Sequence, residues 1–338
     1  QQLALQCAVS PGVELVVRGD VRQDLTGTVS AFTDYNGATS TPAVLNDGGA
    51  TDYAPHVNKF VRITSGVSAD FSSAILKAVA AGQFRPAIFK SVEAFTSPPG
   101  PGDTFAVEEL TTKIGGVDFS GLVGDGGDPV TFVPRMILRD VEITTPTQDL
   151  VFGTGANLGC YCFRVRFGDG TGQPIISNST VTLLGCLNVD ALTIDQTASV
   201  YIFGHGDAGY IAVLGGHVFN GSIGGGGIIH QGPFGGLTVT GRFITRIQDV
   251  YLDSENDACL TIEQGGFYSA SHANSLVWGA DNLVPTYGIR VWSGSMMEFV
   301  TEPTVTGVND TIVGGTVRTY VQIPYFEPFN GAGIVARA

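Results

Sequence analysis

The chain has 338 residues, of which 43% are hydrophobic and only 14% are charged, and its formal net charge is −14. This acidity argues against a nucleic-acid surface or an anionic membrane as partner, because both require clusters of Lys and Arg. The 47 glycines are about twice the usual share of roughly 7%, which favours tight turns and β-structure over helices. No run of about 18 apolar residues occurs, so we expect no transmembrane span, and Gln1–Val9 lacks the pattern of a secretory signal peptide.

Residues 1–125 are predicted to form a β-rich N-terminal attachment region. Two strands are expected in "VELVVRGDV" and "KFVRITSGV". The segment Ser72–Gln83, "SSAILKAVAAGQ", is the best short helix in the chain, with a β-turn-β insertion as the alternative interpretation. The glycine-rich stretch Gly121–Pro129 is the expected boundary with the next part.

Residues 126–300 are a series of short strand-like segments separated by Gly, Asn and Asp. The words "LTVTG" at 237–241 and "LTIEQG" at 260–265 repeat each other at a distance of about 23 residues. Related positions follow one another at similar distances, namely Thr193, Val213, Thr238, Thr261 and Arg290. Because only inward-pointing residues must match between stacked repeats, this pattern predicts an all-β solenoid, a right-handed parallel β-helix with coils of about 23 residues.

Residues 301–338 lose this spacing and are predicted to be a C-terminal cap or an interface arm. Terminal repeats of a solenoid need a cover, and the aromatic residues of this tail are too many for a solvated segment. The interface candidates are Tyr320, Tyr325, Phe326 and Phe329.

The cysteines are expected to be core residues and not a disulfide framework. Cys162 and Cys186 are 24 residues apart, close to the repeat distance, so we expect both in one internal stack, buried and reduced.

No constellation of residues predicts catalysis or a cofactor. Asp195 and Glu263 both follow a "Leu-Thr-Ile" word, but they would lie about three coils apart, too far to act as a catalytic pair. Asp253, Glu255 and Asp257 form an oxygen-rich segment and are the only calcium candidates, with solvated turn acids as the alternative. Arg164 and Arg166 are expected on one face of a single strand, as an outward face or an interface.

The aromatic residues of the last coils leave two interpretations open. Exposed aromatic side chains would suit sugar stacking or a protein interface, whereas buried ones would be core stacks. These residues are Tyr251, Phe267, Tyr268, Trp278, Tyr287 and Trp292.

Two segments resemble structural proteins of tailed bacteriophages. The first is Phe60–Leu110, with "RITSG" leading to a loop and then "PGDTFAVEEL"; the second is Tyr287–Phe326, with "YGIRVWSG", "PTVTG" and a Gly-Gly-Thr strand. The resemblance implies a virion protein, either a capsid decoration or minor capsid component, or a tail fibre or spike that binds or depolymerises polysaccharide. It brings no catalytic residue, so we expect no enzyme; a glycoside hydrolase or polysaccharide lyase is the alternative.

The same resemblance implies the partners and the location of the chain. The expected partners are other virion proteins of a capsid or tail lattice and further copies of the chain, with a trimer favoured, and a surface polysaccharide is a further candidate. The expected location is the particle surface, or alternatively the extracellular space.

Overall fold

The computed structural model is all-β, as the composition predicts, and the only helical turn among its described residues is the 3-10 segment Ala54–His56. The structure describes residues 14–34, 43–86, 98–120, 135–144, 148–153, 159–172, 174–189, 192–195 and 198–203, and after them the backbone of the strands between 211 and 319. Within this part of the chain, no helix is long and apolar enough to cross a membrane.

Residues 21–110 contain an antiparallel sheet of seven strands in the order β2, β8, β5, β6, β7, β4, β3. Their bounds are β2 Val21–Thr28, β3 Ala31–Thr33, β4 Val44–Asn46, β5 Phe60–Ile63, β6 Ser72–Ala80, β7 Gln83–Pro86 and β8 Thr104–Leu110. Its core is an aromatic cluster in which the ring of Phe84 lies 4.5 Å from that of Tyr53 and 5.8 Å from that of Phe105, centroid to centroid. All three side chains are buried, so this sheet has a hydrophobic core of its own.

The segment Ser72–Gln83 forms a β-hairpin and no helix. β6 pairs with β5 on one side and with β7 on the other, so the sheet satisfies its backbone groups along both edges. Gly82 turns the chain with a φ of +71°, a conformation that favours glycine. The helix prediction is wrong because cross-strand pairing outweighs the helix propensity of Ala, Leu and Lys. The alternative interpretation as a β-turn-β segment is confirmed.

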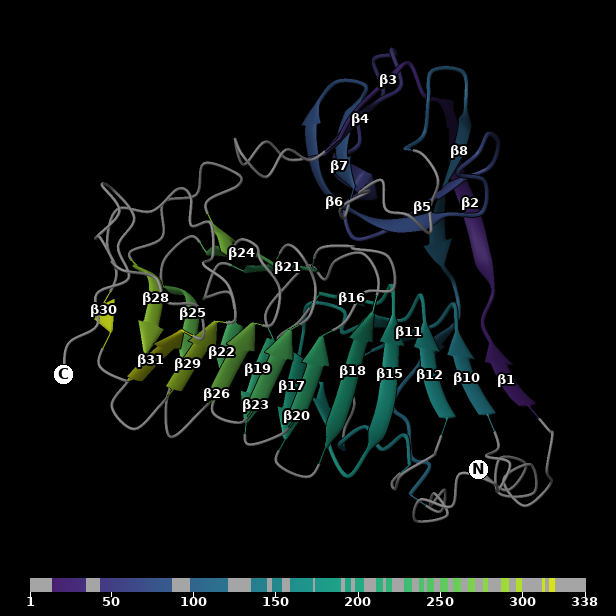
Figure 1. Ribbon diagram of the computed structural model, residues 1–338. Helices are drawn as coiled ribbons and strands as arrows, with labels where there is room; N and C mark the ends of the chain where they lie inside the picture. Colours follow the sequence, from purple (N-terminus) through teal and green to yellow (C-terminus); the bar gives the residue numbers. More distant parts are fainter. Residues whose placement is uncertain are drawn as a thin grey trace.

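The other strands pair in parallel, and the chain visits their sheets in turn (Figure 1). The ten-stranded sheet contains β1 Glu14–Arg18, β10 Arg135–Arg139, β12 Gly159–Phe163, β15 Thr180–Leu184, β18 Ser199–Phe203, β20 His217–Asn220, β23 Arg242–Thr245, β26 Phe267–Ala270, β29 Met296–Phe299 and β31 Thr316–Thr319. A seven-stranded sheet contains β14 Ile175–Ile176, β17 Leu192–Asp195, β19 Ile211–Leu214, β22 Leu237–Val239, β25 Ala258–Ile262, β28 Tyr287–Val291 and β30 Ile312–Val313. The smaller sheets contain β9 Lys113–Ile114, β11 Glu142–Ile143, β13 Arg166–Phe167 and β16 Leu187–Asn188, and β21 Ile228–Gly232, β24 Val250–Ser254 and β27 Leu276–Trp278.

The register of these sheets explains the repeat in the sequence. Residues 237–239 pair one to one with residues 260–262, so the two similar words are neighbouring strands. Successive strands of the ten-stranded sheet from β10 onward are offset by about 18 to 29 residues, which brackets the expected length of about 23. The expected row is confirmed at Thr193, Thr238, Thr261 and Arg290. Its member in β19 is Ala212 and not Val213, a one-residue shift that changes the face of the sheet.

The antiparallel sheet is inserted into the parallel part instead of preceding it. β1 pairs with β10 and β9 pairs with β11, so both flanks of residues 21–110 belong to parallel sheets. The chain thus crosses between the two parts twice, after β1 and before β9, and Figure 1 shows the antiparallel strands beside the β1 end of the parallel row. The boundary predicted at Gly121–Pro129 lies outside the described residues.

The parallel pairing also continues beyond Val300. β30 pairs with β28, and β31 pairs with β29. The segment predicted to be a cap from residue 301 therefore supplies two further strands of the parallel sheets.

Candidate functional site

Arg164 is the centre of a buried charge cluster at the junction between the antiparallel sheet and the parallel sheets. It follows β12 at a corner where its φ is +51°, and its side chain is 6% exposed. Its Nη2 donates a hydrogen bond to Oε2 of Glu108 in β8 at 2.6 Å, and its Nε forms an ion pair with Oδ1 of Asp140 at 2.9 Å. The guanidinium carbon also lies 5.3 Å from the ring centroid of Phe60. The side chain of Arg164, which follows β12, therefore connects β8 of the antiparallel sheet to the residue that follows β10 in the parallel part.

Glu108 is a buried carboxylate held by two guanidinium groups. Arg62 donates from its Nε to Oε1 of Glu108 at 2.7 Å, and Arg164 occupies the other oxygen. Burial alone would raise the pKa of Glu108, but the charges of Arg164 and Arg62 outweigh it and hold the pKa below its ordinary value of 4.5. Glu108 is therefore ionised at neutral pH and holds no proton to donate.

Arg166 makes a second set of contacts at the same junction. Its Nη2 donates to Oε1 of Glu109 at 2.8 Å, and it also donates to Glu142. Each of these carboxylates meets a lysine as well: Lys59 Nζ lies 3.2 Å from Glu109 Oε2, and Lys113 Nζ lies 3.0 Å from Glu142 Oε1. The two adjacent glutamates of β8 are thus each paired with one arginine of the parallel part: Glu108 with Arg164, and Glu109 with Arg166.

The charge pairing in this cluster is suited to holding the two parts together. The buried carboxylates among the described residues are Glu108, Asp140 and Glu142, and each faces at least two cations. A general acid needs surroundings that keep its proton on at neutral pH, whereas opposite charges stabilise the ionised form. Among the side chains that the structure describes, no three or more His, Cys, Asp or Glu gather as metal ligands.

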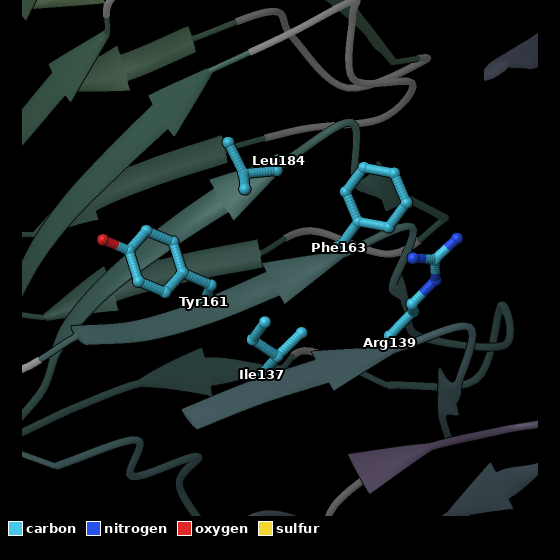
Figure 2. Close-up of a pocket in the computed structure, with 5 residues that line it drawn as sticks. All are labelled: Ile137, Arg139, Tyr161, Phe163 and Leu184. Carbon is cyan, nitrogen blue, oxygen red and sulfur yellow. The ribbon is translucent and has the colours of Figure 1, made fainter. Parts of the chain in front are cut away.

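A second feature is a hollow of about 370 Å³ on one face of the ten-stranded sheet (Figure 2). It is lined by Ile137 and Arg139 of β10, Tyr161 and Phe163 of β12, and Leu184 of β15. The guanidinium of Arg139 lies over the ring of Phe163, 4.7 Å from its centroid.

The hollow follows from the alternation of side chains along these strands. The intervening residues Met136, Leu138, Cys160, Cys162, Val181 and Leu183 are buried on the opposite face. The half-buried outward residues therefore leave an aromatic and aliphatic surface with the guanidinium of Arg139 at its edge, a composition suited to binding.

Comparison with known proteins identifies no relative of the chain: no family model, no curated protein and no solved structure matches it. Its function must therefore be inferred from the junction and the hollow themselves.

Cys162 and Cys186 are both buried and form no disulfide. The Sγ of Cys186 lies 3.3 Å from the carbonyl oxygen of Cys162, but the strand register places Leu183 opposite Cys162. Cys162 lies in β12 and Cys186 follows β15, the neighbouring strand, so the two residues are not paired across the sheet. Burial raises the pKa of Cys162 well above its ordinary value, and it raises that of Cys160 to about 12, so these thiols are unreactive.

The prediction that Arg164 and Arg166 share one strand face is wrong. β12 ends at Phe163, Arg164 forms the corner, and β13 begins at Arg166. Both side chains instead contact glutamates of β8 within the same chain. Their partners Glu108 and Glu109 lie more than fifty residues earlier, and only the acidic pair inside the strand "TFAVEEL" gave a signal for them.

The sequence candidates after residue 203 fall where the structure describes no side chains. Asp253 lies in the backbone of β24, and Glu255, Asp257 and Glu263 lie outside the described residues. The same holds for the four tail aromatics Tyr320, Tyr325, Phe326 and Phe329. The calcium and tail-interface hypotheses therefore stay predictions, and the sequence interpretation missed Tyr161 and Phe163, whose only signal was the alternation in "CYCF".

Proposed function

We propose that this chain is a non-enzymatic structural protein of a virion, a capsid decoration or minor capsid component that docks on a viral lattice. In this proposal the antiparallel sheet is the attachment part, and the parallel sheets wind as a right-handed β-helix that forms the outer body. The order in which the chain visits the parallel sheets supports the winding. The partners would be lattice proteins and further copies of the chain, as a trimer, at the particle surface.

The observation that carries this proposal is the junction. Two chain crossings and the cluster around Arg164 and Arg166 fix the antiparallel sheet to the parallel part. A particle component must hold its docking part and its outer body in a fixed relative orientation. A buried, charge-paired interface does so better than a flexible linker. The cation-paired carboxylates support a role without acid–base catalysis.

The test is to locate the protein on particles. Antibodies against residues 21–110 and against the parallel part are applied to particles purified from the natural source and viewed by electron microscopy. We expect the second antibody to label intact particles and the first to label only particles from which the protein has been released. A protein found only in the soluble fraction would contradict the proposal.

Deletion of residues 325–338 should lower the oligomer mass if the aromatic tail is an interface arm.

A second candidate function is surface-polysaccharide binding, as in a tail spike or fibre. The aromatic hollow on the ten-stranded sheet favours it, because aromatic rings bind the apolar faces of sugars. Release of oligosaccharides by the purified protein would extend this function to depolymerisation.

A further inference from the structure

Among the described residues, the carboxylates near the rim of the hollow do not neutralise all of its positive charge. The register places Arg18, Arg139, Phe163 and Leu184 in one row across four neighbouring strands. The side chains of Arg18 and Arg139 are 64% and 42% exposed, and both face the same oxygen, Oδ2 of Asp140, at 3.7 and 3.0 Å. The other oxygen of Asp140 faces Arg164. One carboxylate thus meets three guanidinium groups.

The second buried carboxylate, that of Glu108, does not neutralise this excess of positive charge. Glu108 is shared between Arg164 and Arg62, so the two buried acids Asp140 and Glu108 together meet four guanidinium groups. Asp70 adds only a 3.6 Å contact to Arg62 from a side chain that is 91% exposed. Within the part of the chain that the structure describes, the excess positive charge therefore lies on Arg139, which lines the hollow, and on Arg18 in the neighbouring strand.

We propose that this hollow binds an acidic saccharide, with the apolar face of a sugar ring on Tyr161 and Phe163 and its carboxylate on Arg139 and Arg18. This inference rests on the second candidate function, polysaccharide binding, and names its ligand. A guanidinium matches a carboxylate in a two-pronged hydrogen-bonded pair. The hollow of about 370 Å³ is at the lower end of small-ligand sites, which suits one or two sugar units.

The charge of the whole chain narrows the ligand class. A net charge of −14 repels a densely charged polymer such as a nucleic acid, whose every residue carries a phosphate. The one or two sugar units of an acidic saccharide that fit a hollow of this size carry only one or two carboxylates, so a local pair of arginines can attract them without a basic surface. The aromatic wall then supplies contact area that a small inorganic anion could not use.

The experiment is titration calorimetry of the full chain with tri-galacturonate, and with the neutral galactotriose of the same linkage as a matched ligand. We expect binding of the acidic trimer that weakens as salt increases, and at least tenfold weaker binding of the neutral trimer. Arg139→Gln should remove most of this preference, and Phe163→Leu should weaken both ligands, since the ring is lost while apolar volume is kept. Arg22→Gln is the control, because that exposed arginine lies in the antiparallel sheet beside Asp24 and should leave both affinities unchanged.

The outcomes separate the two claims. Equal binding of both trimers, unchanged in Arg139→Gln, would overturn the acidic ligand and keep the polysaccharide function. Binding of neither trimer, or binding unaffected by Phe163→Leu, would overturn the site itself. Thermal unfolding of each variant is measured alongside, and Tyr161→Leu, on the same wall, serves as a second variant if Phe163→Leu fails to fold.

Discussion

Replacing Arg164 by Met tests whether the charge cluster holds the junction together. The substitution keeps much of the aliphatic volume but leaves Glu108 and Asp140 each short of one cation in a buried place. Removing one partner of a buried ion pair costs about 3–5 kcal/mol. Arg62 stays on Glu108, and Arg139 and Arg18 stay on Asp140, so we expect the lower end, about 3 kcal/mol of unfolding free energy.

Urea unfolding followed by circular dichroism measures this loss. With a slope of about 3 kcal/mol per molar urea, the midpoint should fall by about 1 M. Glu108→Gln in the Arg164→Met background removes the uncompensated carboxylate, so the double variant should lose less stability than the two single losses combined.

The matched control is Arg22→Met, which removes an exposed ion pair with Asp24 in the same antiparallel sheet. Exposed pairs contribute little to stability, so its midpoint should stay near that of the wild type. If Arg164→Met unfolds at the same urea concentration as Arg22→Met, the cluster does not hold the junction and the reasoning is refuted.

Three further predictions concern acid, steric fit and thiols. The pKa of Glu108 is lowered in the fold, so its stabilisation is complete above the ordinary value of 4.5 and is lost as the pH falls through the lower folded-state value; the urea midpoint should fall below pH 4.5 in the wild type and less steeply in Glu108→Gln. Gly19→Ala would place a Cβ 2.3 Å from the carbonyl oxygen of Asp140, and we expect a loss of about 1–3 kcal/mol, whereas Gly115→Ala meets no atom within 4 Å and should be neutral in the same unfolding assay. Cys160, Cys162 and Cys186 are buried, so mass spectrometry should find them unmodified by maleimide until the protein is unfolded; rapid native labelling of any of them would contradict the packing.

The repeat was predictable from sequence because stacked strands impose it locally. The segments 237–239 and 260–262 have similar sequences because the two strands lie side by side, so the similarity can be seen from these short segments alone. The insertion of residues 21–110 was not predictable, because it depends on the pairing of β1 with β10, about 120 residues apart. A short strand contains no information about which distant edge it joins.

The junction shows the same limit at the level of side chains. The alternation in "CFRVRF" predicted Arg164 and Arg166 on an outward strand face or at an interface, but it did not identify their partners in β8. Their geometry depends on a corner at φ +51°, which arginine rarely adopts. The contacts of Arg164 with Glu108 and Asp140 stabilise that conformation once the two parts meet.

Asp140 connects the junction to the hollow, and its replacement by Asn should move the two properties in opposite directions. Its φ is +57°, which Asn tolerates as well as Asp, so the backbone should not be strained. Loss of the carboxylate leaves Arg164 paired only with Glu108, so we expect the urea midpoint to fall. The same loss leaves Arg18 and Arg139 without their shared counter-charge, so the affinity for tri-galacturonate should rise, while galactotriose binding stays unchanged. A fall in both stability and acidic-trimer affinity would mean that Asp140 orients Arg139 and does not compete with the ligand, and the proposed charge balance at the rim would then be wrong.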